Sequence, residues 1–204
     1  MDWFNLHSRE VVWGGIAVVA LAAGGWFYNR SRELKAERAE KAYYQAVRTQ
    51  AAGNLPLAES DLKKMIQRYD GTPASFQARL QLAQNYYDQG KYQQGVDELK
   101  SAEDKMGSSQ DFGPSVHLVM GVGYEQLKKY PLAADQYEKA SKAARFDADR
   151  QRYLIQAATA YYLAGNKAKA KEIWTELGAD SKGAVAGEAR VRLGELTATP
   201  EPKS

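Results

Sequence analysis

The 204-residue chain has no cysteine and only two histidines, His7 and His117. Without cysteine it has no disulfide scaffold, no thiol nucleophile and no cysteine metal site. No HExxH pair, nucleophile elbow or phosphate-binding loop accompanies the histidines. Gly121-Val122-Gly123 looks like the start of a nucleotide loop, but it sits inside an expected helix and follows no strand. The sequence therefore predicts no enzyme, no cofactor and no metal.

The chain also lacks a strong excess of either charge. It carries 28 Lys and Arg against 25 Asp and Glu, spread along its length, for a net charge of +3. Nucleic-acid-binding domains concentrate basic residues in a patch or stripe. We therefore expect no nucleic-acid partner, and we interpret acidic pairs such as Asp97-Glu98 as solvated surface.

One long apolar run lies near the N-terminus. Residues 11–28 contain no charged side chain and are followed at once by Arg30 and Arg32. At about 1.5 Å per residue, a helix of this length spans roughly 27 Å, enough to cross a hydrocarbon core. Trp13 at one end and residues 26–28 at the other are placed like interfacial aromatic belts. The run is predicted to be a single transmembrane helix.

Two other interpretations compete with a membrane span. A cleaved signal peptide would use residues 20–22 as its small-residue site, but its basic start is poor, with Arg9 alone. A buried core helix is the second alternative, although the rest of the chain supplies its own apolar faces. Within a membrane, small residues permit close contact with another helix. The candidates for such a contact are Gly14, Gly15, Ala20, Gly24 and Gly25.

The stretch after the apolar run favours a continuous helix. Residues 29–52 contain no Gly or Pro, and residues 33–38 are good helix formers. The membrane helix is therefore predicted to run unbroken into the following domain. Such a helix would hold that domain at a fixed angle to the bilayer, unlike a flexible linker.

A pattern of two helices and a turn recurs four times. Its clearest copy occupies residues 82–102, with apolar residues at helical spacing on both sides of the turn. The turns follow one another at 37 or 38 residues, at Gly53, Gly90, Lys128 and Gly165. A small residue recurs in the first helix at Ala46, Ala83, Gly121 and Ala158. The second helix has a small residue at Ala58, Gly95, Ala133 and Ala170. A large residue recurs later in the second helix at Leu62, Leu99, Tyr137 and Trp174.

This pattern resembles a tetratricopeptide repeat array, in which a small residue and a Tyr precede the turn and Ala and an aromatic follow it. The alternative is a generic helical bundle. The usual period is about 34, so each unit carries about three or four extra residues. We place them in the connections at residues 102–115 and 144–149. Together with the apolar run, the resemblance gives an expected all-α fold: one N-terminal transmembrane helix, then a solenoid of about four helix pairs and a capping helix around residues 182–196.

The expected organisation has six parts. They are a short N-terminal segment at residues 1–10, the transmembrane helix at 11–28, a helical neck at 29–37, four repeats at 38–180, the capping helix at 181–196 and a tail at 197–204.

In stacked repeats the first helix of each pair lines a concave inner face. Positions carried over from the fold form a largely apolar and aromatic set, which suits a peptide segment or partner helix. The expected partner-binding residues are Tyr43, Val47, Leu80, Gln84, Tyr87, Leu118, Val122, Arg152, Ile155 and Tyr162. The alternative is that many of them pack within the array.

The order of parts also resembles the bacterial inner-membrane tetratricopeptide family of the ancillary Sec translocon subunit. The resemblance rests on the short N-terminal segment, the single membrane helix, the charged neck RSRELKAERAEKAYYQA and about four repeats. It implies repeats exposed to the periplasm, binding to the translocon and to a membrane-anchored chaperone partner, and no catalysis. The basic residues that follow the apolar run favour the cytoplasm instead under the positive-inside rule. We expect the periplasm, with the cytoplasmic side as the alternative.

The sequence thus predicts a non-enzymatic, membrane-anchored scaffold that docks on an integral-membrane protein complex. By resemblance it is translocon-associated and chaperone-like, with extended polypeptide segments and the lipid bilayer as further partners. The alternative is a permanent structural subunit of a large photosynthetic or respiratory membrane complex.

Overall fold

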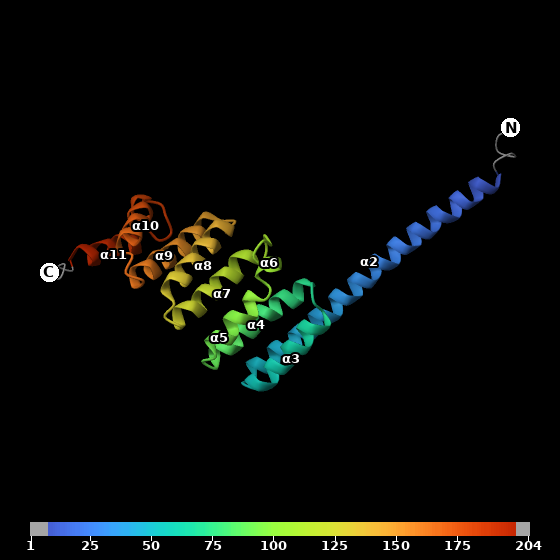
Figure 1. Ribbon diagram of the computed structural model, residues 1–204, viewed down its shortest axis with the longest axis horizontal. Helices are drawn as coiled ribbons and strands as arrows, with labels where there is room; N and C mark the ends of the chain where they lie inside the picture. The colour runs from blue at the N-terminus through green and yellow to red at the C-terminus, as the bar shows by residue number, and fades with distance from the viewer. Residues whose placement is uncertain (1–7, 199–204) are drawn as a thin grey trace.

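A single helix of 44 residues, α2 (Ser8–Ala51), begins the described chain in this computed structural model, which describes residues 8–198. Its length is about 66 Å at 1.5 Å per residue. Figure 1 shows the first part of α2 projecting away from the other helices, while its last part lies against α3. The predicted continuity between the apolar run and the first repeat is therefore confirmed.

The remaining helices form pairs that follow one another along the molecule (Figure 1). In chain order they are α3 (Leu55–Arg68), α4 (Pro73–Asp88), α5 (Tyr92–Lys100), the short α6 (Glu103–Met106), α7 (Gly113–Gln126), α8 (Tyr130–Ala143), α9 (Asp147–Leu163), α10 (Lys167–Ala179) and α11 (Ala186–Ala198). The end of α2 pairs with α3, α4 with α5, α7 with α8 and α9 with α10, and α11 packs on α10. The described residues contain helices and no strands, as the predicted fold class requires.

Proline and short polar side chains fix where several helices begin. Proline occupies one of the first two positions of four helices, where the missing N–H removes no intrahelical bond. These residues are Pro56, Pro73, Pro114 and Pro131. Three helices start with a side-chain oxygen that accepts the backbone N–H three residues later. These caps are Asn54, Thr72 and Asn166.

The turn inside each pair has the same geometry in all four repeats. The backbone is left-handed at Gly53 (φ 80°), Gly90 (φ 73°), Lys128 (φ 56°) and Gly165 (φ 85°). In each repeat the N–H of the next residue donates to the carbonyl five residues before it, which is the Schellman bond that ends a helix. The donor and acceptor pairs are Asn54 and Thr49, Lys91 and Tyr86, Lys129 and Tyr124, and Asn166 and Tyr161. Lys128 therefore replaces the turn glycine, as predicted.

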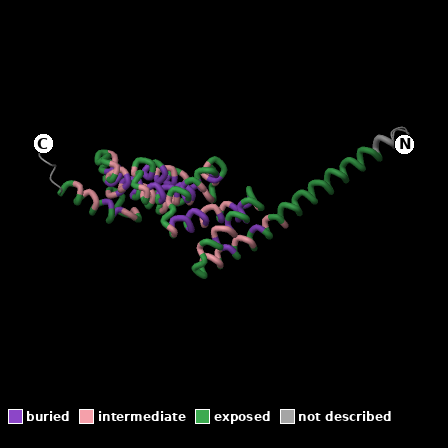
Figure 2. Tube along the Cα trace, turned by 60° about the horizontal axis from the view of Figure 1, so that its bottom comes forward, coloured by how far each residue is buried: buried purple, intermediate pink, exposed green. Residues whose placement is uncertain are grey.

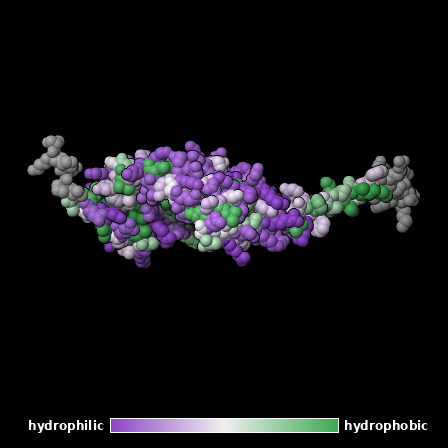
Figure 3. Space-filling model, turned by 90° about the horizontal axis from the view of Figure 1, so that it is seen from below, coloured by the Kyte–Doolittle hydropathy of each residue, from purple (hydrophilic) through white to green (hydrophobic). Residues whose placement is uncertain are grey.

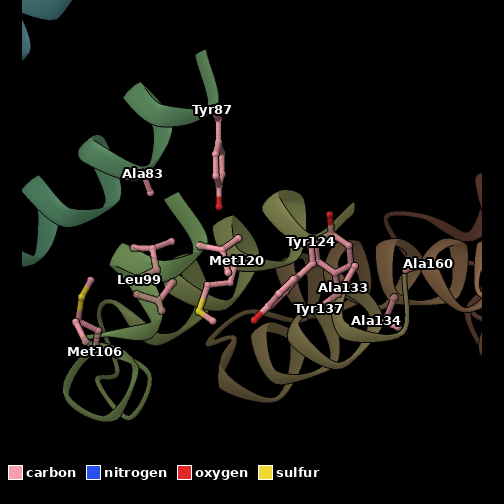
Figure 4. Packing of buried hydrophobic residues seen from close by; sticks show 14 residues of the cluster. Ala83, Tyr87, Leu99, Met106, Met120, Tyr124, Ala133, Ala134, Tyr137 and Ala160 are labelled. Atoms are coloured by element: carbon pink, nitrogen blue, oxygen red, sulfur yellow. The ribbon is translucent and has the colours of Figure 1, made fainter. Parts of the chain in front are cut away.

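The recurring small residues are where the helices approach one another. All eight are buried, and six of them are alanines with no exposed surface. A Cβ at Gly121 would overlap the ring of Tyr137, and one at Gly95 would overlap the ring of Tyr87. Figure 4 shows Tyr87 pointing from α4 toward Met120 of α7. Its hydroxyl donates to the carbonyl of Val119 at 3.1 Å, so one side chain joins two successive repeats.

Buried residues form three clusters along the solenoid. The first joins α2, α3 and α4, the second joins the middle repeats through α9, and the third joins α9, α10 and α11. Figure 2 shows that burial is confined to the repeats, while the projecting part of α2 is exposed. The alternative that the apolar run is a buried core helix is therefore wrong, since none of its window is buried.

Two predicted boundaries are corrected. The connection expected at residues 144–149 is shorter, because α9 already begins at Asp147 and runs for 17 residues. Acidic residues in its first turn favour this start, and Asp147 pairs with Arg150 at 2.9 Å. The last helix begins at Ala186 and not near residue 182, because Asp180 and Gly183 form a turn that precedes it. The expected tail falls partly outside the described residues, as does much of the N-terminal segment.

Lys128→Gly should stabilise the protein by about 0.5–1 kcal/mol, because glycine adopts a left-handed backbone without the Cβ penalty that lysine carries. Urea unfolding followed by circular dichroism in mild detergent measures the change. The reverse substitution in the equivalent turn, Gly165→Lys, should destabilise. A Lys128→Gly protein of unchanged or lower stability would contradict the strain assigned to this turn.

Gly123→Ala should destabilise by about 1–3 kcal/mol, because the added methyl group would overlap the Tyr87 hydroxyl and a methyl group of Val96. Gly187→Ala is the matched control, since a Cβ there has open space and alanine favours the helix. The same unfolding measurement should show the control at least as stable as the parent. Equal stability of both variants would refute close packing at Gly123.

Candidate partner-binding surface

The predicted inner-face residues differ in how accessible the fold leaves them. Two are buried, Tyr87 and Ile155. Five are half-buried, namely Tyr43, Val47, Leu80, Leu118 and Tyr162. Three are exposed, namely Gln84, Val122 and Arg152. The predicted set therefore divides into residues that build the solenoid and residues that a partner can reach.

Tyr87 and Ile155 have structural contacts that occupy their side chains. Tyr87 is 7% exposed and fills the space between Gly95 and Gly123. Burial raises the pKa of Tyr87 above its ordinary value, so the phenol stays protonated and donates to Val119. Ile155 is 2% exposed within the cluster that joins α9 to α10 and α11. These two residues are not available to a partner in this conformation.

A row of accessible side chains runs along the first helices. Each member lies one residue after the buried small residue of its repeat, so the repeats place them in equivalent positions on successive helices. The row consists of Val47, Gln84, Val122 and Thr159. Thr159 was missing from the predicted set, although the alignment of repeats places it in the same position. We call these four residues the inner row, and they alternate between apolar and polar character.

Half-buried apolar residues lie beside the inner row. Leu80 and Leu118 pack against the middle cluster, and Tyr43 packs against the first cluster. The rings of Tyr43 and Tyr44 lie 5.8 Å apart, and Tyr44 is 62% exposed. Burial and the neighbouring Tyr44 raise the pKa of Tyr43. The N-terminal end of this face is therefore aromatic.

At the C-terminal end of the inner face, α11 covers part of the fourth repeat. The rings of Tyr162 and Trp174 lie 5.8 Å apart, and Leu193 and Leu196 of α11 pack against the same cluster. A cavity of about 90 Å³ remains there, lined by Thr159, Tyr162, Trp174, Arg192, Glu195 and Leu196. The last helix thus lies where the capping helix was predicted, against the fourth repeat.

The described residues contain no candidate metal site. No group of three or more His, Asp or Glu side chains in residues 8–198 could hold a metal ion. His117 is 7% exposed, and its Nδ1 lies 2.8 Å from Oε1 of Gln136. The hydroxyl of Tyr137 donates to the carboxylate of Glu125 at 2.8 Å. Burial of Tyr137 and its hydrogen bond to this carboxylate both raise the pKa of the phenol. These polar groups are engaged with one another inside the repeats.

The second candidate surface is the projecting part of α2. Figure 3 shows apolar side chains along it, in contrast to the largely hydrophilic face of the repeats seen in the same view. Among residues 8–198, α2 is the one helix long and apolar enough to cross a membrane. Among the small residues predicted for helix contact, Ala20 is exposed, and a Cβ at any of the four glycines would have open space in the described structure. A partner for Gly14, Gly15, Ala20, Gly24 and Gly25 stays a prediction.

The chain belongs to the family of tetratricopeptide repeat-like domains, whose model matches residues 1–118. The matched stretch includes the apolar part of α2 as well as the first two helix pairs. Proteins built from these repeats generally act by binding other proteins and are generally not enzymes. No curated protein matches the sequence.

Several solved structures share the fold. A tetratricopeptide repeat protein from Parabacteroides merdae matches with a TM-score of 0.63 and 17% identity, over 79% of this chain and 60% of that chain. The TPR-like repeats of a putative kinesin light chain from Podosopora anserina match with a TM-score of 0.62 and 17% identity. The match covers 78% of this chain and 85% of that chain. MamA of Desulfovibrio magneticus, from residue 41 to the end, matches with a TM-score of 0.56 and 17% identity. The match covers 80% of this chain and 97% of that chain. At these identities the likeness concerns the fold alone.

Val122→Glu should weaken partner binding several-fold while changing the stability of the fold by less than about 1 kcal/mol, since this side chain is 38% exposed on the inner row. Leu132→Glu in α8 is the matched control, with a 47% exposed apolar side chain on the second helix of the same pair. Photo-crosslinking in native membranes measures the partner contact. Equal loss of crosslinking in both variants would contradict binding at the inner row.

Proposed function

We propose that this protein is a membrane-anchored repeat scaffold without catalytic activity that docks on an integral-membrane protein complex. The observation that carries the proposal is the single helix α2. Its first part is exposed and apolar, and its last part is the first helix of the first repeat. The anchor and the binding domain therefore share one rigid element.

Exposed apolar side chains support the membrane anchor. Val12 is 58% exposed and Leu21 is 77% exposed, although both belong to a run that water solvates poorly. A bilayer would remove these side chains from water over the roughly 27 Å that residues 11–28 span as a helix. Trp13 at one end and Trp26 at the other are also exposed, as interfacial anchors require.

The junction between anchor and repeats supports a fixed orientation. Ala39 and Ala46 of α2 have no exposed surface and pack in the cluster that includes Leu62 and Met65 of α3. The ammonium of Lys35 also donates to the carbonyl of Asp70 at 3.1 Å. A helix held in this way sets the height and angle of the solenoid above the bilayer, which a flexible linker would not do.

Two partners fit this arrangement. The resemblance to the ancillary Sec translocon subunit favours a periplasmic, chaperone-like protein of the bacterial inner membrane that receives extended polypeptides on the inner row. The rigid junction favours the second candidate, a permanent structural subunit of a photosynthetic or respiratory complex. In the second case the outer faces of the repeats would also be covered by neighbouring subunits.

A tag at the C-terminus allows the complex to be isolated from native membranes in mild detergent. Mass spectrometry of the isolated complex then distinguishes the two candidates. Substoichiometric Sec components together with varied secretory polypeptides support the chaperone-like function. A fixed ratio to one photosynthetic or respiratory assembly identifies a structural subunit. Recovery of the chain without any integral-membrane protein would overturn docking on a membrane complex.

Inserting a flexible Gly-Ser segment after Arg32 should abolish assembly with the complex without preventing membrane insertion, because it separates the anchor from the packed part of α2. Co-purification measures assembly, and resistance to alkaline carbonate extraction measures insertion. The same insertion after Ser181, between α10 and α11, controls for the added residues. Normal assembly of the first variant would show that the rigid junction is dispensable.

A further inference from the structure

A cavity of about 360 Å³ lies where the apolar part of α2 meets the end of α3. It is formed by one face of α2 together with the last residues of the first repeat. The lining residues are Phe27, Arg30, Ser31, Leu34, Lys35, Arg38, Arg68 and Tyr69. On α2 they recur at three- and four-residue spacing, so they form a stripe along one side of the helix.

All the charged side chains that line this cavity are positive. Four of its lining residues are cationic and none is acidic. Neither Arg38 nor Arg68 has a carboxylate within 4 Å in the described part of the chain, and Lys35 donates to the neutral carbonyl of Asp70. The guanidinium of Arg68 lies 5.6 Å from the centre of the Tyr69 ring, a cation–π contact between two lining residues.

The nearby carboxylates are paired with basic side chains, one of which, Arg30, itself lines the cavity. Glu33 pairs with Arg30 at 3.2 Å and lines a separate cavity on another side of α2. Glu37 accepts from Lys41 at 2.7 Å, which holds the pKa of Glu37 below its ordinary value. The carboxylate of Asp70 pairs with Arg79 at 3.3 Å and with Lys105 at 3.5 Å. Arg38 helps to lower the pKa of Glu37 but has no carboxylate within 4 Å in residues 8–198, and neither has Arg68, so both guanidinium groups can accept an external anion as a partner.

The position of the cavity identifies the anion. Phe27 is the penultimate residue of the apolar run, and Arg30 follows it by about 4.5 Å along the helix axis. The polar headgroup layer is about 5–7 Å thick on each side of a bilayer, so Arg30 lies at headgroup level when the run spans the hydrocarbon. Lys35, Arg38 and Arg68 lie above that level on long side chains that can extend toward it. Guanidinium forks match the oxygens of a phosphate group.

We infer that this cavity binds the headgroup of an anionic phospholipid, with its acyl chains against Phe27 and the apolar part of α2. The inference rests on the proposed membrane anchor. An acidic peptide would need no apolar surface beside the cations, whereas a lipid needs both. A bound headgroup bridges α2 and the end of α3, so it joins the bilayer surface to the first repeat.

Native mass spectrometry of the full chain in mild detergent, with equal amounts of phosphatidylglycerol and phosphatidylcholine, tests this site. The parent should retain phosphatidylglycerol in preference to phosphatidylcholine. Each basic residue near an anionic surface contributes about fivefold in affinity, so the double variant Arg38→Gln/Arg68→Gln should bind phosphatidylglycerol roughly 25-fold more weakly. The matched control is Lys167→Gln/Lys171→Gln, two exposed cations of α10 that form no ion pair with any residue of 8–198 and lie at the far end of the solenoid.

The outcomes separate the site from the anchor. Equal retention of the two lipids by the parent, or an equal loss in the control variant, would overturn the headgroup site. Displacement of phosphatidylglycerol by a similar concentration of inorganic phosphate would show that the site binds a free anion, which would also overturn it. Alkaline carbonate extraction of native membranes tests the anchor separately. Release of the parent chain would overturn the anchor, whereas firm retention without lipid preference would overturn the headgroup site alone.

Discussion

The close approach of helices at small residues is the constraint on which the whole solenoid depends. Tyr87 illustrates it, because its ring lies against Gly95 of its own repeat while its hydroxyl reaches the backbone of α7 at Val119. Gly123 provides the space for that hydroxyl, and Gly121 provides space for Tyr137. Each aromatic side chain thus determines the distance between two helices. Repeating this arrangement sets the spacing of successive repeats and places the inner row on one face.

The second constraint is that one helix, α2, forms both the proposed membrane anchor and the first helix of the first repeat. The end of α2 is covered by α3 and α4, whereas residues 12–33 of the same helix are exposed in the part of the chain that the structure describes. A conventional repeat array begins with a helix whose outer side faces water. Here the first helix extends about 30 residues beyond the first buried contact at Ala39. The direction of the anchor is consequently determined by the packing of the first repeat, and the basic cavity lies at the point where the two meet.

Much of this architecture could be predicted from the sequence because four copies of the repeat can be aligned and compared with one another. The alignment identified Lys128 as a turn residue although lysine rarely adopts a left-handed backbone. It was less successful at helix ends, as at Asp147, because local capping decides those positions within each copy. Accessibility was also harder to predict. Burial of Tyr87 depends on Gly123 in the next repeat, and Gly95 in place of the alanine of other copies was the only signal of a deeper space.

The basic cavity could not be found by periodicity. Its residues come from positions 27–38 and from positions 68 and 69, and no local pattern relates these segments. The basic residues of the neck were visible in the sequence, but their grouping against Arg68 and Tyr69 depends on how α3 packs on α2. The same applies to the carboxylates, since interleaved Glu33 and Glu37 suggest a neutral neck until their partners are known.

The shared helix also has a consequence for how the protein folds during synthesis. Starting a helix is costly, whereas extending one costs little, because each added residue gains a hydrogen bond. The apolar part of α2 leaves the ribosome before the repeats do, and a bilayer would drive it to become helical because no water satisfies its backbone there. Residues 29–51 would then extend an existing helix. In an array stabilised by contacts between neighbours, this first helix is the template on which α3 and α4 assemble. Membrane insertion would thereby give the folding of the solenoid a starting point and a direction, from the bilayer outward.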